Sequence, residues 1–451
     1  TSTGTLTLKD DNNEAGSLKA TGSNDGAGIG GSKDNGTNNI IITGGTVNAT
    51  ANRNGAGIGG GGGEGGNGED ITITGGTVTA TGGSDGTGIG DGAGIGGGGY
   101  KGNGKNITIT GGTVTAEGCA LGAGIGGAYG GVGKNITITG GTVNAAGAVG
   151  AGIGGGEGGN GKNITINGGE VTAAVGDYGA GIGGGYEGYG KDITITGGTV
   201  TAKGGLGGAG IGGGAYGGGE DITITGGTVT ASGCAGAGIG GGIDRSGSNV
   251  TVSGAAQVTV TASKSSAWDS ADTGATIGNG GSVTEDNDLV DGKEIQADIS
   301  HLTTGYIHHI IYNLDSSIKR EWWEPERPQP NPEDPNAPAE ESNEVSLGTP
   351  LLHVETLEGA PLPFDARQQG STLRVTTDNL AARLHGTRQA LEALREQGVE
   401  QIQFVTTLKT TTLPVAELLA EGGSWFALEH DGLVSRRLSA AQAESLKCWM
   451  H

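Results

Sequence analysis

The chain has 451 residues, of which 103 are glycine, and its formal net charge is −23. This excess of negative charge repels phosphate backbones and anionic lipids, so we expect neither nucleic acid nor anionic membrane surfaces as partners. The sequence contains no run of about 18 apolar residues, which excludes membrane insertion by a helix.

Residues 1–280 are built from a repeat. Each copy contains three short alternating runs, typified by GAGIG, ITIT and TVTA, in which the apolar residues are two apart. This spacing places them on one face of a β-strand. The isoleucine of the GIG motif recurs in steps of 28–30 residues, with one step of 37, at Ile29, Ile58, Ile95, Ile125, Ile153, Ile182, Ile211 and Ile239.

Three strands per copy, joined by glycine-rich corners, predict a coil with three sides. One coil cannot bury its apolar side chains alone, whereas stacked coils share a continuous core. We therefore predict a mainly β fold, a right-handed parallel β-helix of about nine three-sided coils of about 29 residues. In the coil around residues 150–174, the predicted core residues are Ile164, Ile166, Val171 and Ala173.

Three further regions follow the repeat. Residues 281–320 lose the periodicity and are expected to cap the last coil, whose backbone edge needs a partner. Residues 321–344 are rich in proline and glutamate, which is typical of a stiff, solvated linker. Residues 345–451 alternate strand and helix patterns and predict a small C-terminal α/β domain. Its helices are expected at 388–397, from Pro414 onward, and after a capping box formed by Ser439 and Gln442.

The phrase NITITGGTVTA followed by GAGIGGG resembles tandem-repeat β-solenoid surface proteins of gut Firmicutes. It is more distantly similar to clostridial carbohydrate-binding β-helix proteins. The resemblance covers roughly residues 20–245 and implies a secreted or cell-surface bacterial protein. The first residues, TSTGTLTL, are typical of a trimmed product rather than of a signal peptide. Cys119 and Cys234 lie four coils apart, beyond disulfide reach, and Cys448 lies near the C-terminus.

Five tyrosines lie in the same corner of the repeat, between GIGG and the next ITIT: Tyr100, Tyr129, Tyr186, Tyr189 and Tyr216. Because stacked coils are about 4.8 Å apart, we expect these rings to form one partly exposed stripe that is broken at Glu157. Aromatic rings beside acidic side chains can bind sugars through stacking and through hydrogen bonds to hydroxyl groups. The alternative is that the tyrosines only cover glycine corners.

Three other activities have weaker support. GGNGEDITI at 65–73 resembles a calcium-binding nonapeptide, but its apolar residue is out of phase, and asparagine replaces Asp70 in several copies. This mixed asparagine and aspartate row is expected to bond to nearby backbone amides. Outward threonine rows are typical of some ice-binding β-helices, but asparagine and glutamate interrupt them here. A polysaccharide lyase or hydrolase needs clustered carboxylates and a base, whereas residues 1–280 hold two arginines and no histidine precedes His301.

The sequence therefore favours a non-enzymatic, extracellular β-solenoid that serves as scaffold or stalk of a bacterial cell-surface adhesin. The alternative function is a carbohydrate-binding module that uses the tyrosine-lined edge. We expect no catalytic residue, no metal and no cofactor. The expected partner is a glycan or another ligand on a host or cell-wall surface, and the expected oligomeric state is a monomer.

Overall fold

The computed structural model describes residues 4–10, 16–84, 86, 91–264, 273–283, 289–314, 317–325, 352–357, 362, 364–377, 379, 381–406, 409–420, 422–431 and 434–439. The chain divides into two compact units, Thr1–Gln329 and Pro330–His451. Each unit has its own hydrophobic core, so each is described separately.

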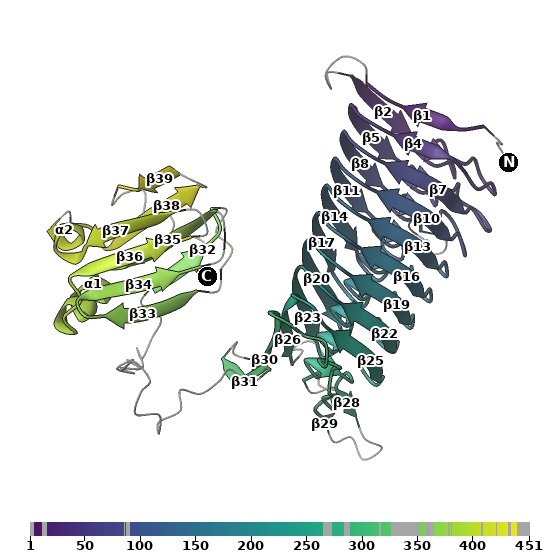
Figure 1. Ribbon diagram of the computed structural model, residues 1–451. Helices are drawn as coiled ribbons and strands as arrows, with labels where there is room; N and C mark the ends of the chain where they lie inside the picture. The colour runs from purple at the N-terminus through teal and green to yellow at the C-terminus, as the bar shows by residue number, and fades with distance from the viewer. Residues whose placement is uncertain are drawn as a thin grey trace. The chain divides into compact units, whose positions relative to one another are not determined.

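The first unit is a parallel β-solenoid whose coils contribute strands to three long sheets (Figure 1). The first sheet contains, in spatial order, β1 (Leu6–Leu8), β4 (Ile40–Ile42), β7 (Gly68–Ile73), β10 (Gly104–Ile109), β13 (Gly133–Ile138), β16 (Gly161–Ile166), β19 (Gly190–Ile195), β22 (Gly219–Ile224) and β25 (Gly247–Val252). The second contains β2 (Ser17–Thr21), β5 (Thr46–Thr50), β8 (Thr77–Thr81), β11 (Thr113–Glu117), β14 (Thr142–Gly147), β17 (Glu170–Val175), β20 (Thr199–Leu206), β23 (Thr228–Cys234), β26 (Gln257–Ser263), β30 (Tyr306–Tyr312) and β31 (Ile318–Glu324). The third has two-residue strands: β3 (Ile29–Gly30), β6 (Ile58–Gly59), β9 (Ile95–Gly96), β12 (Ile125–Gly126), β15 (Ile153–Gly154), β18 (Ile182–Gly183), β21 (Ile211–Gly212), β24 (Ile239–Gly240) and β27 (Ile277–Gly278).

The stack is longer than the nine coils expected. The first and third sheets have nine strands each, but the second has eleven. The two additional strands arise because β30 continues parallel to β26 and β31 then pairs antiparallel with β30. A mainly β, parallel solenoid is thus confirmed, while its count of turns is closer to eleven, and its right-handedness stays a prediction.

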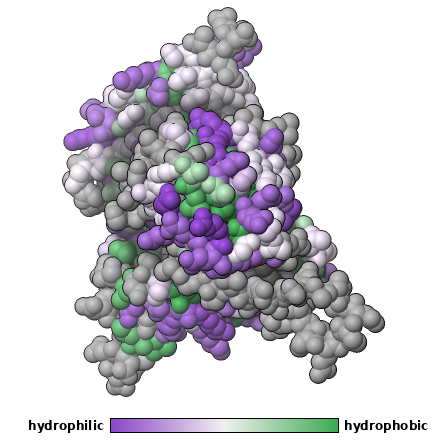
Figure 2. All heavy atoms as spheres, turned by 90° about the vertical axis from the view of Figure 1, so that its left-hand side faces the viewer, coloured by the Kyte–Doolittle hydropathy of each residue, from purple (hydrophilic) through white to green (hydrophobic). Residues whose placement is uncertain are grey.

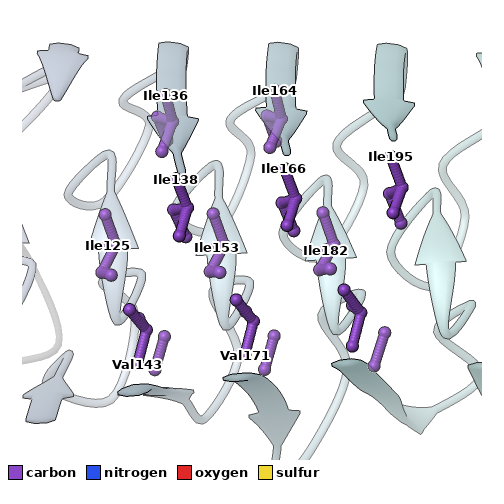
Figure 3. Close-up of a cluster of buried hydrophobic side chains, with 14 of the residues drawn as sticks. Ile125, Ile136, Ile138, Val143, Ile153, Ile164, Ile166, Val171, Ile182 and Ile195 are labelled. Carbon is purple, nitrogen blue, oxygen red and sulfur yellow. The ribbon is translucent and has the colours of Figure 1, made fainter. Parts of the chain in front are cut away.

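Equivalent apolar residues stack in register from coil to coil and fill the interior of the solenoid (Figure 3). Ile136 of β13, for example, is the register partner of Ile164 of β16. Ile164, Ile166, Val171 and Ala173 are each at most 1% exposed, which confirms the predicted inward face. Full burial of one such isoleucine stabilises the fold by about 1.5–3 kcal/mol, and every coil contributes several apolar side chains.

At the C-terminal end of the solenoid, the last repeat strand of each sheet has a hydrogen-bonding partner. These strands are β25, β26 and β27. In the second sheet the partner is β30. In the first, Val252 N donates to Asp298 O at 2.9 Å. In the third, the Glu294 carboxylate accepts from Thr276 N at 2.7 Å and from Ile277 N at 3.0 Å. These contacts satisfy backbone groups that another coil would otherwise bind.

The cap extends further than the 281–320 expected from the sequence. Residues 321–324 belong to β31 and therefore lie in the second sheet rather than in a linker. The proline-rich residues after 325 lie outside the described part of the chain. A small antiparallel pair, β28 (Ser282–Val283) and β29 (Leu289–Val290), precedes the last two strands of the second sheet.

Two histidines of β30 stack against the two tryptophans of β31, with ring centroids 3.8 Å apart for His308 and 4.4 Å apart for His309. His309 is 3% exposed, and its Nδ1 lies 2.7 Å from Thr276 Oγ1. Its Nε2 lies 3.8 Å from the Glu324 carboxylate. Burial, together with the charges of His308 and Arg320, lowers the pKa of His309 to about 3. This histidine is therefore neutral in the folded cap.

Acidification is expected to destabilise the solenoid between pH 6.5 and about 3. The unfolded chain protonates His309 near its ordinary pKa of 6.5, whereas the folded protein keeps it neutral down to about 3. The unfolded state thus binds more protons, and the free energy of unfolding falls as pH falls, by at most about 1.4 kcal/mol per pH unit from this histidine. Urea denaturation near pH 7 and near pH 5 measures the change. His309→Gln should reduce this loss of unfolding free energy between pH 7 and pH 5, whereas His308→Gln should not. Equal pH dependence in both variants would contradict the conclusion that buried, neutral His309 causes the loss.

In its described residues, the second unit consists of two four-stranded sheets and two short helices. One sheet contains β32 (Leu352–Glu355), β35 (Ala381–Thr387), β38 (Trp425–Asp431) and β39 (Val434–Arg437), all antiparallel. The other contains β33 (Asp365–Gln369), β34 (Thr372–Thr376), β36 (Gln401–Val405) and β37 (Thr410–Pro414), with one parallel pair between β34 and β36. The helices are α1 (Arg388–Glu396) and α2 (Val415–Ala420).

This unit is a small sheet domain, so the expected α/β domain of alternating strands and helices is wrong in its balance of elements. The helix expected at 388–397 is confirmed as α1, whose N-cap Thr387 accepts a hydrogen bond from Ala390 N through its side chain. Pro414 ends β37, and α2 begins one residue later. The helix expected after Ser439 lies outside the described residues. Strands dominate because short hairpin connections, rather than helices, join β33 to β34, β36 to β37 and β38 to β39.

The exposed large hydrophobic side chains are spread over both units. They are Leu6, Leu18, Tyr189, Val290, Leu314, Ile318 and Phe364. On the face that Figure 2 shows, small hydrophobic areas are set among hydrophilic side chains. Apolar residues scattered in this way are normal on protein surfaces and do not by themselves define an interface. Within the described residues, no helix is long and apolar enough to cross a membrane.

Candidate functional site

In six successive coils, the corner between the third and first sheets has a residue in the left-handed backbone region three residues before the strand of the first sheet begins. Its φ is between 58° and 68° at Lys101, Gly130, Gly158, Glu187, Tyr216 and Asp244. The residue before it is Tyr100, Tyr129, Glu157, Tyr186, Ala215 or Ile243, in the same order of coils. Each corner therefore offers distinct positions, and side chains are comparable between coils only when they occupy the same one.

The five candidate tyrosines occupy three of these positions. Tyr100, Tyr129 and Tyr186 directly precede the left-handed residue, whereas Tyr216 is itself the left-handed residue, with φ of 63°. Tyr189 lies three residues after Tyr186, where the chain enters β19. The structure therefore brings these tyrosines together in smaller groups rather than along one line of equivalent positions.

The first group is a pair. The ring centroids of Tyr100 and Tyr129 are 5.5 Å apart, with the rings tilted by 45°. The Nζ of Lys101 lies 4.7 Å from the centroid of Tyr100, within the range of a cation–π contact. Both rings are half-buried.

The second group includes a tyrosine that sequence reasoning missed. Tyr186 makes edge contacts with Tyr178 at 5.5 Å and with Tyr216 at 5.7 Å. The three rings pack on a small apolar cluster of Ala215, Ala235 and Ile243. Tyr178 comes from the corner after β17. Its place directly before the GAGIG motif was its only sequence signal. This packing is the geometry expected of side chains that cover small residues.

Burial and neighbouring carboxylates shift the pKa values of two side chains in or near the second group. Burial, then the neighbouring carboxylates of Glu187 and Asp91, raise the pKa of Glu157. Burial and the carboxylate of Glu187 also raise the pKa of Tyr186. Tyr189 differs from the other tyrosines because it is 49% exposed, and its ring lies over Gly218 of the next coil.

The asparagine and aspartate row forms a ladder along the first sheet. Asn106 Nδ2 donates to Asp70 Oδ1 at 2.8 Å, Asn135 to Asn106 at 2.9 Å, and Asn163 to Asn135 at 2.7 Å. The expectation that these side chains bond to backbone amides is therefore wrong. All members have φ between 52° and 56°, a conformation that asparagine and aspartate tolerate better than most residues: Asp70, Asn106, Asn135, Asn163, Asp192, Asp221 and Asn249. The shared conformation aligns the side chains with one another instead.

A second row, which sequence reasoning also missed, lies one residue before the ladder. Lys105, Lys134, Lys162 and Lys191 are register partners in four consecutive coils, and we call them the lysine row. Glutamates occupy the next place at each end, Glu69 on one side and Glu220 on the other. The repeated GKN and GKD motifs were its sequence signal.

The lysines at the ends of the row have closer acidic partners than those in the middle. Lys105 Nζ lies 3.0 Å from Glu69 Oε1, and Lys191 contacts Glu220. Lys162 Nζ is 3.8 Å from Asp192 Oδ2. Lys134 is exposed, and the described residues include no acidic group within ion-pair distance of it. Hydrogen bonds to Glu220 raise the pKa of Lys191, so this end of the row is held positive.

The second unit has a separate network of buried charges. Arg383 donates to Glu429 Oε1 through Nε at 3.0 Å and through Nη2 at 2.7 Å, and to Glu355 Oε1 at 2.7 Å. Burial opposes ionisation of Glu429, but hydrogen bonds from Arg383 and Arg436 lower its pKa. Opposite charges on four adjacent strands neutralise one another here, which is a structural arrangement. Within the described residues, no group of three histidine, cysteine or acidic side chains is placed to hold a metal ion.

The fold and its stacked corners define a tandem-repeat parallel β-solenoid. A family model described as a beta helix repeat matches residues 14–33, 40–62, 107–129, 136–157, 164–186, 193–215 and 222–243. These matched segments are similar to the beta helix repeat, and they follow one another along the solenoid. No curated protein and no solved structure matches the chain. Cys119 and Cys234 are free thiols, and Cys448 lies outside the described residues.

Proposed function

We propose that the protein is a non-enzymatic scaffold or stalk of an extracellular adhesin on a bacterial cell surface. The observation that carries this proposal is the in-register repetition of equivalent residues along all three sheets. Repetition produces long, uniform rows on the outside, as the ladder illustrates, and rows suit extended contact with a surface polymer. A catalytic site instead requires different groups that converge on one point.

The stiffness of the solenoid supports the same role. The nine stacked strands of the first sheet, about 4.8 Å apart, give a rod on the order of 40 Å long, and the second sheet extends two strands further. Each level pairs with its neighbours through three parallel sheets and shares one core. A rod of this kind would hold an attached domain at a fixed distance from the cell surface.

The test is a pair of measurements on the full chain. Incubation with pectins and mucin glycans should release no new reducing or unsaturated ends. Immunolabelling of intact producer cells should place the protein outside the membrane. Product release, or labelling confined to permeabilised cells, would overturn this proposal.

A second candidate function is glycan binding along the tyrosine-lined edge. The observations in its favour are the 49% exposure of Tyr189 and the half-buried pair Tyr100 and Tyr129, whose nearer member lies two coils away from Tyr189. Tyr186 and Tyr216 contribute less because their faces are used in the cluster with Tyr178.

Titration with oligosaccharides of increasing length tests the tyrosine edge. Each stacking contact is worth about 1 kcal/mol, so oligomers should bind measurably and monomers weakly. Tyr189→Ala should weaken oligomer binding several-fold. Tyr178→Ala, which removes a ring used for packing, should reduce stability more than affinity. Binding that is independent of oligomer length, or unchanged in Tyr189→Ala, would leave the tyrosines as covers of glycine corners.

A further inference from the structure

The lysine row places like charges directly beside one another. Lys105, Lys134, Lys162 and Lys191 face register partners on adjacent parallel strands, about 4.8 Å apart. Like charges directly opposite each other destabilise a sheet. The chain has an alternative, because the same position holds glutamate in β7 and β22, where it pairs with the end lysines. Four consecutive lysines therefore have an electrostatic cost that alternating charges would avoid.

The groups beside the lysine row are suited to hydroxyl-rich ligands. The residue after each lysine belongs to the asparagine and aspartate ladder, whose side chains are exposed or half-buried. Two residues beyond the ladder, outward threonines form a further register row on the same strands. Its members are Thr72, Thr108, Thr137, Thr165, Thr194, Thr223 and Thr251. Each of the four coils of the lysine row thus presents an ammonium, an amide or carboxylate, and a hydroxyl in a fixed order.

We propose that the lysine row binds a linear acidic polysaccharide, with the polymer axis along the solenoid and one carboxylate for each coil. A polymer of uronic acids carries one carboxylate per sugar ring, and one ring advances the chain by a step similar to the strand spacing of about 4.8 Å. Its carboxylates meet the ammonium groups, and its hydroxyl groups meet the neighbouring amides and threonines. This interaction goes beyond the scaffold role and does not depend on the tyrosines.

The spacing of the lysines discriminates against other polyanions. An extended peptide presents side chains on one face at every second residue, about 6.6 Å apart, which drifts out of phase with the row within two or three coils. Nucleic acid is opposed by the net charge of −23 over the whole chain. Duplex nucleic acid carries one charge per about 1.7 Å of its axis, so this repulsion acts on it more strongly than on a polymer with one carboxylate per sugar ring.

The ion pairs already present do not block the site. Lys162 and Asp192 are 3.8 Å apart with both side chains more than 40% exposed, and Lys105 and Glu69 are also partly exposed. Exposed pairs of this kind contribute little and exchange partners readily. Lys134, in the middle, is available directly, so binding is expected to centre on Lys134 and Lys162.

The experiment measures binding of the full chain to polygalacturonate oligomers by calorimetry at low and at physiological ionic strength. The charge-reversal variant is Lys134→Glu/Lys162→Glu. It replaces three lysine–lysine neighbours with two lysine–glutamate pairs and one glutamate–glutamate pair, so it should fold about as well as the parent. The matched control is Lys19→Glu/Lys203→Glu, two exposed lysines of the second sheet, because it changes the net charge by the same amount. Fully methyl-esterified oligomers of equal length, polyglutamate and single-stranded DNA are the comparison ligands.

We expect the acid oligomers to bind more tightly as their length increases up to about four sugars, and more weakly as salt screens the charges. The row variant should lose about tenfold or more in affinity, while the control variant stays within about twofold of the parent. Equal weakening in the control would mean that only net charge matters and would overturn the proposal. Tighter or equal binding of polyglutamate, DNA or the esterified oligomers would also overturn it, as would no binding at all.

Discussion

Replacement of Gly154 with alanine is expected to abolish cooperative folding of the solenoid. Gly154 closes β15, has φ of 142°, and an added Cβ would lie 1.9 Å from the carbonyl oxygen of Gly183 in the next coil. No side-chain rotation relieves this clash, because both atoms belong to the backbone of stacked strands. The coils must separate locally, and we expect a loss of about 4 kcal/mol or more. Urea denaturation monitored by far-UV circular dichroism measures it.

Gly158 is the matched control in the same coil. It also has a positive φ, 68°, but an added Cβ would meet only Gly130 Cα, at 3.9 Å. Equivalent corners carry Glu187 and Tyr216 in the same conformation, so a side chain is accepted there. Gly158→Ala should therefore cost about 1 kcal/mol, the strain of the left-handed conformation. If Gly154→Ala unfolds at the same urea concentration as Gly158→Ala, then close stacking of the GIG strands does not explain the requirement for glycine at position 154.

Ile166→Asp is expected to have an effect of similar size by a different mechanism. Ile166 is fully buried in the first sheet and stacks between Ile138 and Ile195 of the neighbouring coils. The substitution removes apolar burial worth about 2–5 kcal/mol and places a carboxylate where no described cation is within reach. Burying an unpaired charge costs several more kcal/mol. The variant should show no cooperative transition near neutral pH.

Thr165→Asp tests whether direction, rather than the aspartate itself, causes this loss. Thr165 is the adjacent residue of β16 and is half-buried on the outer face. Because consecutive side chains of a strand alternate between faces, this variant should unfold within about 1 kcal/mol of the parent. Comparable destabilisation of Thr165→Asp and Ile166→Asp would contradict the assignment of inward and outward faces.

The tyrosine corner illustrates where prediction from the sequence ended. Tyr186 and Tyr216 follow the same GIGG motif and appear equivalent, but they differ by one position in the corner. That offset places Tyr216 in the left-handed conformation and brings it edge-on to Tyr186. Tyr178 joins them from the corner between the second and third sheets. Its distance from Tyr186 depends on how the coil closes, which the sequence pattern does not reveal.

The lysine row is the opposite case. The sequence contains each of its lysines in a repeated motif, but it does not show that they lie side by side on adjacent strands. The repeated GKN motif places one lysine in each of four copies, yet the overall charge of −23 directed attention away from anionic ligands. Register between coils converts four separate lysines into one row. Net charge is a sum over the whole chain and contains no information about such a local arrangement.

The sequence by itself determined the strands, the inward residues and the repeat length, because a spacing of two between apolar residues is a local property and recurs in each copy. Only the tertiary structure decided which side chains of different coils meet. The ladder from Asp70 to Asn163 and the pair Tyr100 and Tyr129 depend on register between residues 28 to 36 apart in the sequence. The antiparallel end at β31 depends on the pairing of β30 with the last coil and with β31. Register is set by stacking of the whole coil, and a shift of one residue in a corner redirects a side chain without changing the pattern from which the strands were predicted.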